Sequence, residues 1–205
     1  MKRINCIGDS HISVFSETDL LLPISKWENH DRFNIFHAGP RTAYGVFNKQ
    51  HIINACNSIP GDEYVLLCFG EIDGRCRVHL AGDKYKNIEL IANNYFKLID
   101  NIPTRNIIVL SVTPCLVEDP FKEWHDANPG MRRNVRTSTR GTMTQRNEYK
   151  RYLNNCIRGY CDDKDYIFVD IWNNVLHKPD MYRDDIHLSG VQIYKTLYTL
   201  LSEYR

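Results

Sequence analysis

Residues 4–11 read Ile4-Asn5-Cys6-Ile7-Gly8-Asp9-Ser10-His11, a short apolar run that stops at a glycine and presents a serine just beyond it. Short apolar runs bounded by glycine are typical of buried strands. We therefore expect a central strand over residues 3–7 and a short helix or helical turn over residues 12–22. Ser10 would lie at the N-terminal end of that turn, where free backbone N–H groups stabilise a developing negative charge.

A second motif, Asp184-Asp185-Ile186-His187, lies near the other end of the chain. A serine becomes a useful nucleophile when a histidine takes its proton, and a carboxylate best holds that histidine for the task. An Asp three residues before a His can turn back onto Nδ1 and leave Nε2 free to face Ser10. We predict a catalytic Ser10, His187 and Asp184, with Asp185 as the rival for the orienting role.

Between these motifs, apolar strand patterns alternate with helical patterns. Strands are expected at residues 33–38, 64–69, 106–112 and 166–171, and helices at residues 44–58, 84–102, 144–161 and 188–204. Such alternation predicts an α/β fold, a flavodoxin-like three-layer α/β/α sandwich with a mainly parallel sheet of about five strands. The carboxyl ends of parallel strands share one edge, so the motifs that follow them should meet there.

Four motifs in order resemble the blocks of the SGNH/GDSL hydrolase superfamily. They are Gly8-Asp9-Ser10, Gly39, Gly70-Glu71-Ile72-Asp73 and Asp184-x-x-His187. The resemblance spans nearly the whole chain and implies the same sandwich fold, with a serine esterase or O-acetyltransferase activity. It also implies an oxyanion hole made by the backbone N–H groups of Ser10 and Gly39. One position departs from the family, because Ile72 stands where the third block has an asparagine.

Ile72 removes the side-chain amide that the family uses as a further oxyanion donor. Arg75 is close enough in sequence to enter the same cleft, and a guanidinium stabilises an oxyanion at least as well as an amide. We therefore assign Arg75 to the oxyanion hole, and an ion pair with Glu71 or Asp73 is the alternative. Asp73 is expected to brace this loop beside the substrate.

Residues 115–142 lose all periodicity and are rich in Pro, Asn and Gly. A long irregular insertion is typical of a lid or binding loop. The substrate is expected to be an O-acyl or O-acetyl ester on a carbohydrate or related metabolite. The expected substrate-binding residues, beside Asp73, are Tyr44, Trp124, Arg132 and Arg133. The arginines of the insertion would favour an anionic substrate, and the alternative is that they form a solvated face.

Composition limits the other possibilities. The chain has 205 residues, 42% hydrophobic and 25% charged, which fits one domain over residues 1–205. Its net charge of +1 gives no overall field for nucleic acid or a membrane surface, so neither is expected as a partner. There is no apolar run of signal-peptide or membrane-span length, which favours a cytoplasmic protein. Seven cysteines without a Cys-x-x-Cys pair indicate free thiols, and neither a metal nor another cofactor is expected.

Three alternatives to ester hydrolysis remain open at this point. An O-acetyltransferase would use the same residues and pass the acyl group to a sugar hydroxyl. A metal-dependent phosphoesterase would use Asp9-x-His11 with Asp73, Asp184 and His187. A non-catalytic member of the fold would bind a glycan or acyl group. The sequence does not indicate the oligomeric state.

Overall fold

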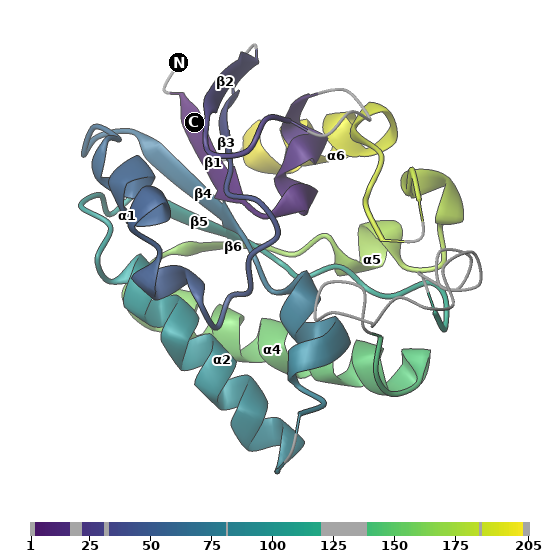
Figure 1. Cartoon of the computed structure of the whole chain (residues 1–205). Coiled ribbons are helices and arrows are strands. Elements are labelled where there is room, and N and C mark those ends of the chain that lie inside the picture. Colours follow the sequence, from purple (N-terminus) through teal and green to yellow (C-terminus); the bar gives the residue numbers. More distant parts are fainter. Residues whose placement is uncertain are drawn as a thin grey trace.

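The computed structural model describes residues 3–16, 22–30, 33–80, 82–119, 139–184 and 186–202. Its centre is a sheet of six strands in the order β2-β3-β1-β4-β5-β6, in which β2 alone runs antiparallel to its neighbour (Figure 1). The strands are β1 (Ile4–Gly8), β2 (Trp27–His30), β3 (Phe33–His37), β4 (Tyr64–Cys68), β5 (Ile107–Leu110) and β6 (Ile167–Val169). The mainly parallel sheet expected from the sequence is therefore confirmed.

Helices cover both faces of the sheet and complete the three-layer sandwich (Figure 1). One face packs against α1 (Gln50–Asn57), α2 (Lys84–Ile99) and α4 (Met143–Lys164). The other face packs against the 3-10 helix η1 (Ser10–Ser16), α5 (Trp172–Val175) and α6 (Gly190–Ser202). Three short elements complete the order: the 3-10 helix η2 (Val46–Asn48), the π-helical turn η3 (Asp73–Arg77) and the 3-10 helix η4 (Pro179–Met181). No helix in the described ranges is both long enough and apolar enough to cross a lipid bilayer.

Successive side chains of each central strand point to opposite faces of the sheet and pack in the two apolar layers. Ile7 of β1 and Leu67 of β4 face the layer of α1, α2 and α4, whereas Cys6 and Leu66 face the layer of η1 and α6. All four are completely buried. Burial on both faces is the expected state of a parallel sheet, and it explains why these strands read as continuous apolar runs.

Three local features differ from the sequence prediction. The edge strand β2 was not expected, because Trp27-Glu28-Asn29-His30 contains no β-branched residue and no apolar alternation. The helix expected over residues 44–58 is divided into η2 and α1. The helix expected over residues 12–22 is a 3-10 helix that begins at Ser10, and residues 17–21 lie outside the described ranges.

The insertion expected at residues 115–142 lies mostly outside the described residues, but both of its ends are tied to α4. The Arg146 side chain is completely buried and donates to the carbonyls of Val117 (2.8 Å), Glu118 (2.7 Å) and Gly141 (2.6 Å). One helix residue therefore holds the chain on both sides of the insertion. We call this contact the Arg146 clasp.

Candidate active site

The predicted triad residues come together at the carboxyl edge of the sheet. Ser10 begins η1 directly after β1, and His187 Nε2 lies 2.8 Å from Ser10 Oγ. His187 Nδ1 lies 2.9 Å from Asp184 Oδ2, and Asp184 Oδ1 accepts the backbone N–H of His187 at 2.7 Å. An antiparallel bridge pairs Tyr182 with Leu188, and the Arg183 N–H donates to the His187 carbonyl at 3.0 Å, which keeps Asp184 close to His187. Asp185, the rival for the orienting role, lies outside the described residues.

The environment of the triad favours a neutral His187 beside a charged Asp184. Burial lowers the pKa of His187, and the positive charge of His11 lowers it further, against the opposing effect of Asp184. Burial alone would raise the pKa of Asp184, but hydrogen bonds from His187 and the backbone outweigh it and hold that pKa well below its usual range. A neutral imidazole can accept the Ser10 proton, so the general base is ready at neutral pH.

The backbone of Gly39 is arranged for the predicted oxyanion hole. In the parallel pairing of β1 and β3, Gly8 lies opposite His37, and the Ala38 N–H donates to the Gly8 carbonyl at 2.7 Å. Ser10 and Gly39 therefore follow the ends of two paired neighbouring strands, two residues beyond Gly8 and His37. The φ of Gly39 is +76°, a value that glycine adopts without strain. Within the described residues, neither the Ser10 nor the Gly39 N–H has a hydrogen-bond acceptor.

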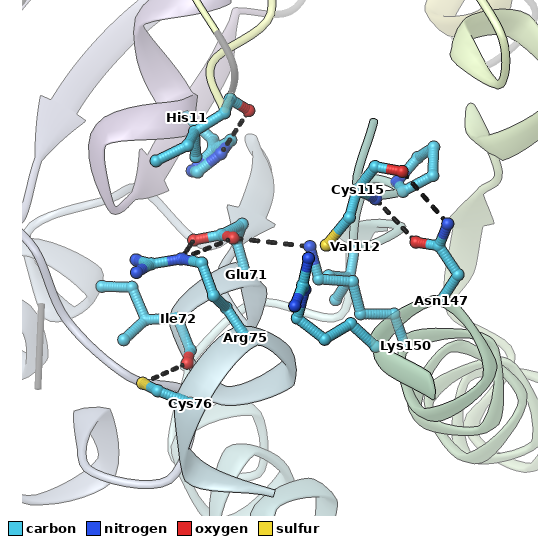
Figure 2. Close-up of polar contacts among 12 residues, drawn as sticks. His11, Glu71, Ile72, Arg75, Cys76, Val112, Cys115, Asn147 and Lys150 are labelled. Atoms are coloured by element: carbon cyan, nitrogen blue, oxygen red, sulfur yellow. Dashed lines mark hydrogen bonds and ion pairs between the residues drawn. The ribbon is translucent and has the colours of Figure 1, made fainter. Parts of the chain in front are cut away.

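The third block forms a buried ion-pair cluster instead of an amide donor (Figure 2). Arg75 Nε donates to Glu71 Oε1 at 3.1 Å, and Lys150 Nζ lies 3.4 Å from the same oxygen. The stem of Lys150 passes over Gly74, where a Cβ would lie 2.4 Å from Lys150 Cγ. Burial alone would raise the pKa of Glu71, but Arg75, Lys150 and His11 hold it well below the usual range.

This cluster contains the ion pair that was the alternative role for Arg75. The Arg75 side chain is 4% exposed and its Nε donates to Glu71, so the ion pair with Glu71 is present, and the assignment of Arg75 to the oxyanion hole stays a prediction. The Ile72 side chain is buried and has no hydrogen-bond donor, and the Ile72 carbonyl accepts the Cys76 thiol at 2.8 Å. The backbone N–H groups of Ser10 and Gly39 are therefore two donors that an oxyanion could use.

Asp73 braces a loop, as expected, but the substrate contact assigned to it is wrong. Its carboxylate is completely buried and accepts the backbone N–H groups of Ala43 (2.6 Å) and Tyr44 (3.3 Å). Burial raises the pKa of Asp73 to about 7, against the effect of these hydrogen bonds. The loop that follows Gly39 is thus attached to the turn that follows β4.

The remaining predicted substrate-binding residues are only partly described. Tyr44 is half-buried, and the Arg77 guanidinium carbon lies 3.4 Å from the centre of its ring. One face of Tyr44 is therefore already occupied by a cation. Trp124, Arg132 and Arg133 lie outside the described residues, so their contact with a substrate stays a prediction.

His11 belongs to the site, although sequence reasoning gave it no role in ester chemistry. Its Nδ1 lies 3.0 Å from Asp9 Oδ1 and its ring centre lies 4.9 Å from that of His187. The signal in the sequence was Asp9-x-His11, a pattern that also occurs in metal-binding motifs. In the part of the chain that the structure describes, no group of three or more His, Cys, Asp or Glu side chains is arranged to hold a metal ion.

Comparison with solved structures places the fold among acylhydrolases, while no family model and no curated protein matches the sequence. A lipase/acylhydrolase from Enterococcus faecalis has 12% identity and a TM-score of 0.54, over 100% of this chain and 95% of that one. A carbohydrate acetylesterase from Sinorhizobium meliloti has 18% identity and a TM-score of 0.53, over 98% and 100%. An acetylxylan esterase from Geobacillus stearothermophilus has 14% identity and a TM-score of 0.53, over 98% and 93%. The fold implied by the SGNH/GDSL resemblance is thus confirmed.

Proposed function

We propose that this protein is a serine esterase that removes O-acyl groups, principally O-acetyl groups, from a carbohydrate or related metabolite. The observation that carries the proposal is the continuous hydrogen-bonded chain from Ser10 Oγ through His187 to Asp184, with contacts of 2.8 and 2.9 Å. These are the distances at which a histidine can take a proton from a serine and be held by a carboxylate. The similarity to a carbohydrate acetylesterase and to an acetylxylan esterase supports the same reaction class.

The reaction follows from these contacts in two steps. Ser10 Oγ attacks the ester carbonyl carbon while His187 Nε2 takes the serine proton, and the oxyanion is stabilised by the N–H groups of Ser10 and Gly39. The bond to the leaving alcohol then breaks as Nε2 returns the proton to the alcohol oxygen. In the second step, water gives a proton to Nε2 and attacks the acyl-serine, which releases the carboxylic acid and restores Ser10.

Because Ile72 has no side-chain amide, the site has one oxyanion donor fewer, and this limits which esters can react quickly. Removing one oxyanion donor costs about 100 to 1,000-fold in rate for an ordinary ester. An ester whose leaving alcohol is a weaker base needs less oxyanion stabilisation. We therefore propose that activated esters, such as phenyl acetates or acetyl groups on acidic sugar hydroxyls, are turned over better than simple alkyl acetates.

The decisive experiment compares wild type with Ser10→Ala on p-nitrophenyl acetate, with and without EDTA. We expect Ser10→Ala to lower kcat by at least about 1,000-fold, and EDTA to have no effect. Ser58→Ala is the matched control, because Ser58 is exposed and bonds only its own helix, through the Ala55 carbonyl. EDTA-sensitive turnover that survives in Ser10→Ala would contradict the serine mechanism and favour the phosphoesterase alternative.

Labelling with a fluorophosphonate gives a second, independent readout. A fluorophosphonate attaches to an activated serine with loss of fluoride, and mass spectrometry of peptides then locates the modified residue. We expect the label on Ser10, and none on Ser10→Ala. An unlabelled wild-type protein without esterase activity would support the non-catalytic alternative.

A further inference from the structure

His11 occupies a position between the nucleophile turn and the loop that carries the general base. It follows Ser10 directly in η1, and its side chain is 6% exposed. Its Nδ1 lies 3.0 Å from Asp9 Oδ1, and its Nε2 lies 3.2 Å from the carbonyl oxygen of Ile186. Ile186 is the residue directly before His187, so His11 contacts the backbone that places the general base.

Both ring nitrogens of His11 face oxygen atoms that can only accept hydrogen bonds. The ionised carboxylate of Asp9 has no proton to give, and a backbone carbonyl has none either. A neutral imidazole carries a proton on one nitrogen only, so one of the two contacts would set a lone pair against an oxygen. An imidazolium carries protons on both nitrogens and satisfies both contacts. The geometry around His11 is therefore that of a cation.

The charged groups around His11 favour the same protonation state. Asp9 and Glu71 are negative, and Arg75 and Lys150, which both pair with Glu71, are the positive groups of the cluster (Figure 2). Burial alone would lower the pKa of His11, but the charge and hydrogen bond of Asp9, with Glu71, raise it overall against the effect of Lys150. The buried cluster below the site thus supports a proton on His11.

The catalytic ring lies directly against this cation. The ring centres of His11 and His187 are 4.9 Å apart, with an angle of 33° between the planes. On its other sides His187 faces Asp184, and Arg183 Nε lies 3.6 Å from Asp184 Oδ2. A fixed positive charge at this distance opposes protonation of His187.

We propose that His11 is the positioning residue of the general base: as an imidazolium held by Asp9, it fixes the Ile186 carbonyl and keeps His187 neutral. The proposal rests on the proposed esterase function of Ser10 and His187. It makes His11 responsible for two separable effects. The hydrogen bond to Ile186 orients His187, and the charge sets the pH at which His187 becomes an active base.

Two substitutions separate these effects. His11→Gln keeps an amide donor for the Ile186 carbonyl and removes the charge, so the acid limb of kcat/KM should move to higher pH by roughly half to one unit. His11→Leu removes both, so kcat should also fall by about tenfold or more, with KM little changed. His51→Gln is the matched control, because His51 lies on α1 at the opposite face of the sheet and should leave the pH profile unchanged.

A titration of the histidine ring protons by NMR tests the proposal without any activity. In the wild-type protein His11 should remain protonated above pH 6.5 while His187 stays neutral there, and in His11→Gln the pKa of His187 should rise. An absence of esterase activity would remove the proposed function and leave this result intact. A neutral His11 in the wild-type protein at pH 6.5, or an unchanged His187 pKa in folded His11→Gln, would overturn the proposal.

Discussion

The site contains two Asp-His pairs that look alike in sequence and behave as opposites. Asp184 holds Nδ1 of His187, and Asp9 holds Nδ1 of His11, at distances of 2.9 and 3.0 Å. The remaining nitrogen of His187 faces the Ser10 hydroxyl, which can donate a proton. The remaining nitrogen of His11 faces the Ile186 carbonyl, which cannot. His187 is therefore suited to accept a proton, and His11 to keep one.

The partner of the second ring nitrogen and the neighbouring charges distinguish the two Asp-His pairs. Burial does not distinguish them, because burial by itself lowers the pKa of both histidines. The pKa is nevertheless raised for His11 and lowered for His187. A carboxylate beside a histidine is thus insufficient evidence for a general base, and the atom facing the other nitrogen must be identified.

The largest expected difference between the two pairs appears when the carboxylates of Asp184 and Asp9 are neutralised in turn and kcat is measured. Asp184→Asn should lower kcat by about 10,000-fold, because the ring then adopts the wrong tautomer for proton transfer from Ser10. Asp9→Asn should lower kcat by less than about 100-fold, because it displaces the base without removing its orienting group. Equal losses in the two variants would mean that the pairs are not functionally distinct.

The Asp9–His11 pair lies beside the buried cluster of Glu71, Arg75 and Lys150. The contribution of this cluster can be tested by measuring protein stability. Arg75→Met should lower the free energy of unfolding by about 3 kcal/mol, because Glu71 keeps a buried charge with one partner removed. Arg158→Met is the matched control, since Arg158 pairs with Asp170 in an exposed position, and it should cost less than about 1 kcal/mol. Urea unfolding of both variants measures the difference, and similar midpoints would show that the cluster contributes little.

Asp184→Asn should have the larger effect on kcat, but Asp9→Asn should have the larger effect on the free energy of unfolding. Asp9 is 1% exposed, so Asp9→Asn should lower the free energy of unfolding by roughly 2 kcal/mol through a weakened bond to a charged ring. The Asp184 side chain is 49% exposed, and Asp184→Asn should cost less than about 1 kcal/mol. Thermal or urea unfolding at pH 6 tests this, and a more costly Asp184→Asn would contradict the assignment of Asp9 to a structural charge pair.

The smallest expected effect is a change in how stability depends on pH. The folded-state pKa of His11 is raised. The stabilisation that His11 gives the folded protein is therefore fully present below about pH 6.5, and it is lost as pH rises through the folded-state pKa. The folded-state pKa of His187 is lowered. The stabilisation that His187 gives the folded protein is therefore present above about pH 6.5, and it is lost as pH falls through the folded-state pKa. Asp73, with a pKa of about 7, titrates in every variant and cancels in the comparison.

The His11→Gln variant should therefore be less stable than wild type mainly at low pH. The difference in the free energy of unfolding between the two proteins should narrow as pH rises above 6.5. Urea midpoints of both proteins measured from pH 5.5 to 8.5 give this gap directly. A gap that widens with rising pH would indicate that His11 is buried as a neutral ring.

Much of the site was visible in the sequence because its chemistry follows strand ends. Ser10 and Gly39 come after β1 and β3, and parallel strands bring such positions to one edge. The role of His11 was not visible, because its contact with Ile186 joins residues 175 positions apart. For Arg75 the sequence left two roles open, and the π-helical turn η3 brings its Nε back to Glu71, which was the alternative.

The fold was predictable where apolar patterns are strong and unpredictable where polar residues are buried. The strand over residues 64–69 was found from its continuous apolar run, and β4 covers Tyr64–Cys68. In contrast, α4 carries Arg146 and Lys150 as fully buried side chains, which a pattern of apolar residues cannot indicate. Each is buried because it bonds oxygen atoms brought in from other segments of the chain.

The Arg146 clasp has a consequence for how this chain can change over evolutionary time. By joining Val117 and Glu118 to Gly141, it fixes the distance that any intervening sequence must span. Doubling the length of such a closed loop costs only about 0.6 kcal/mol in entropy. Because one buried side chain holds both ends, we expect natural variation or protein engineering to change the length between them at a small cost in folding free energy.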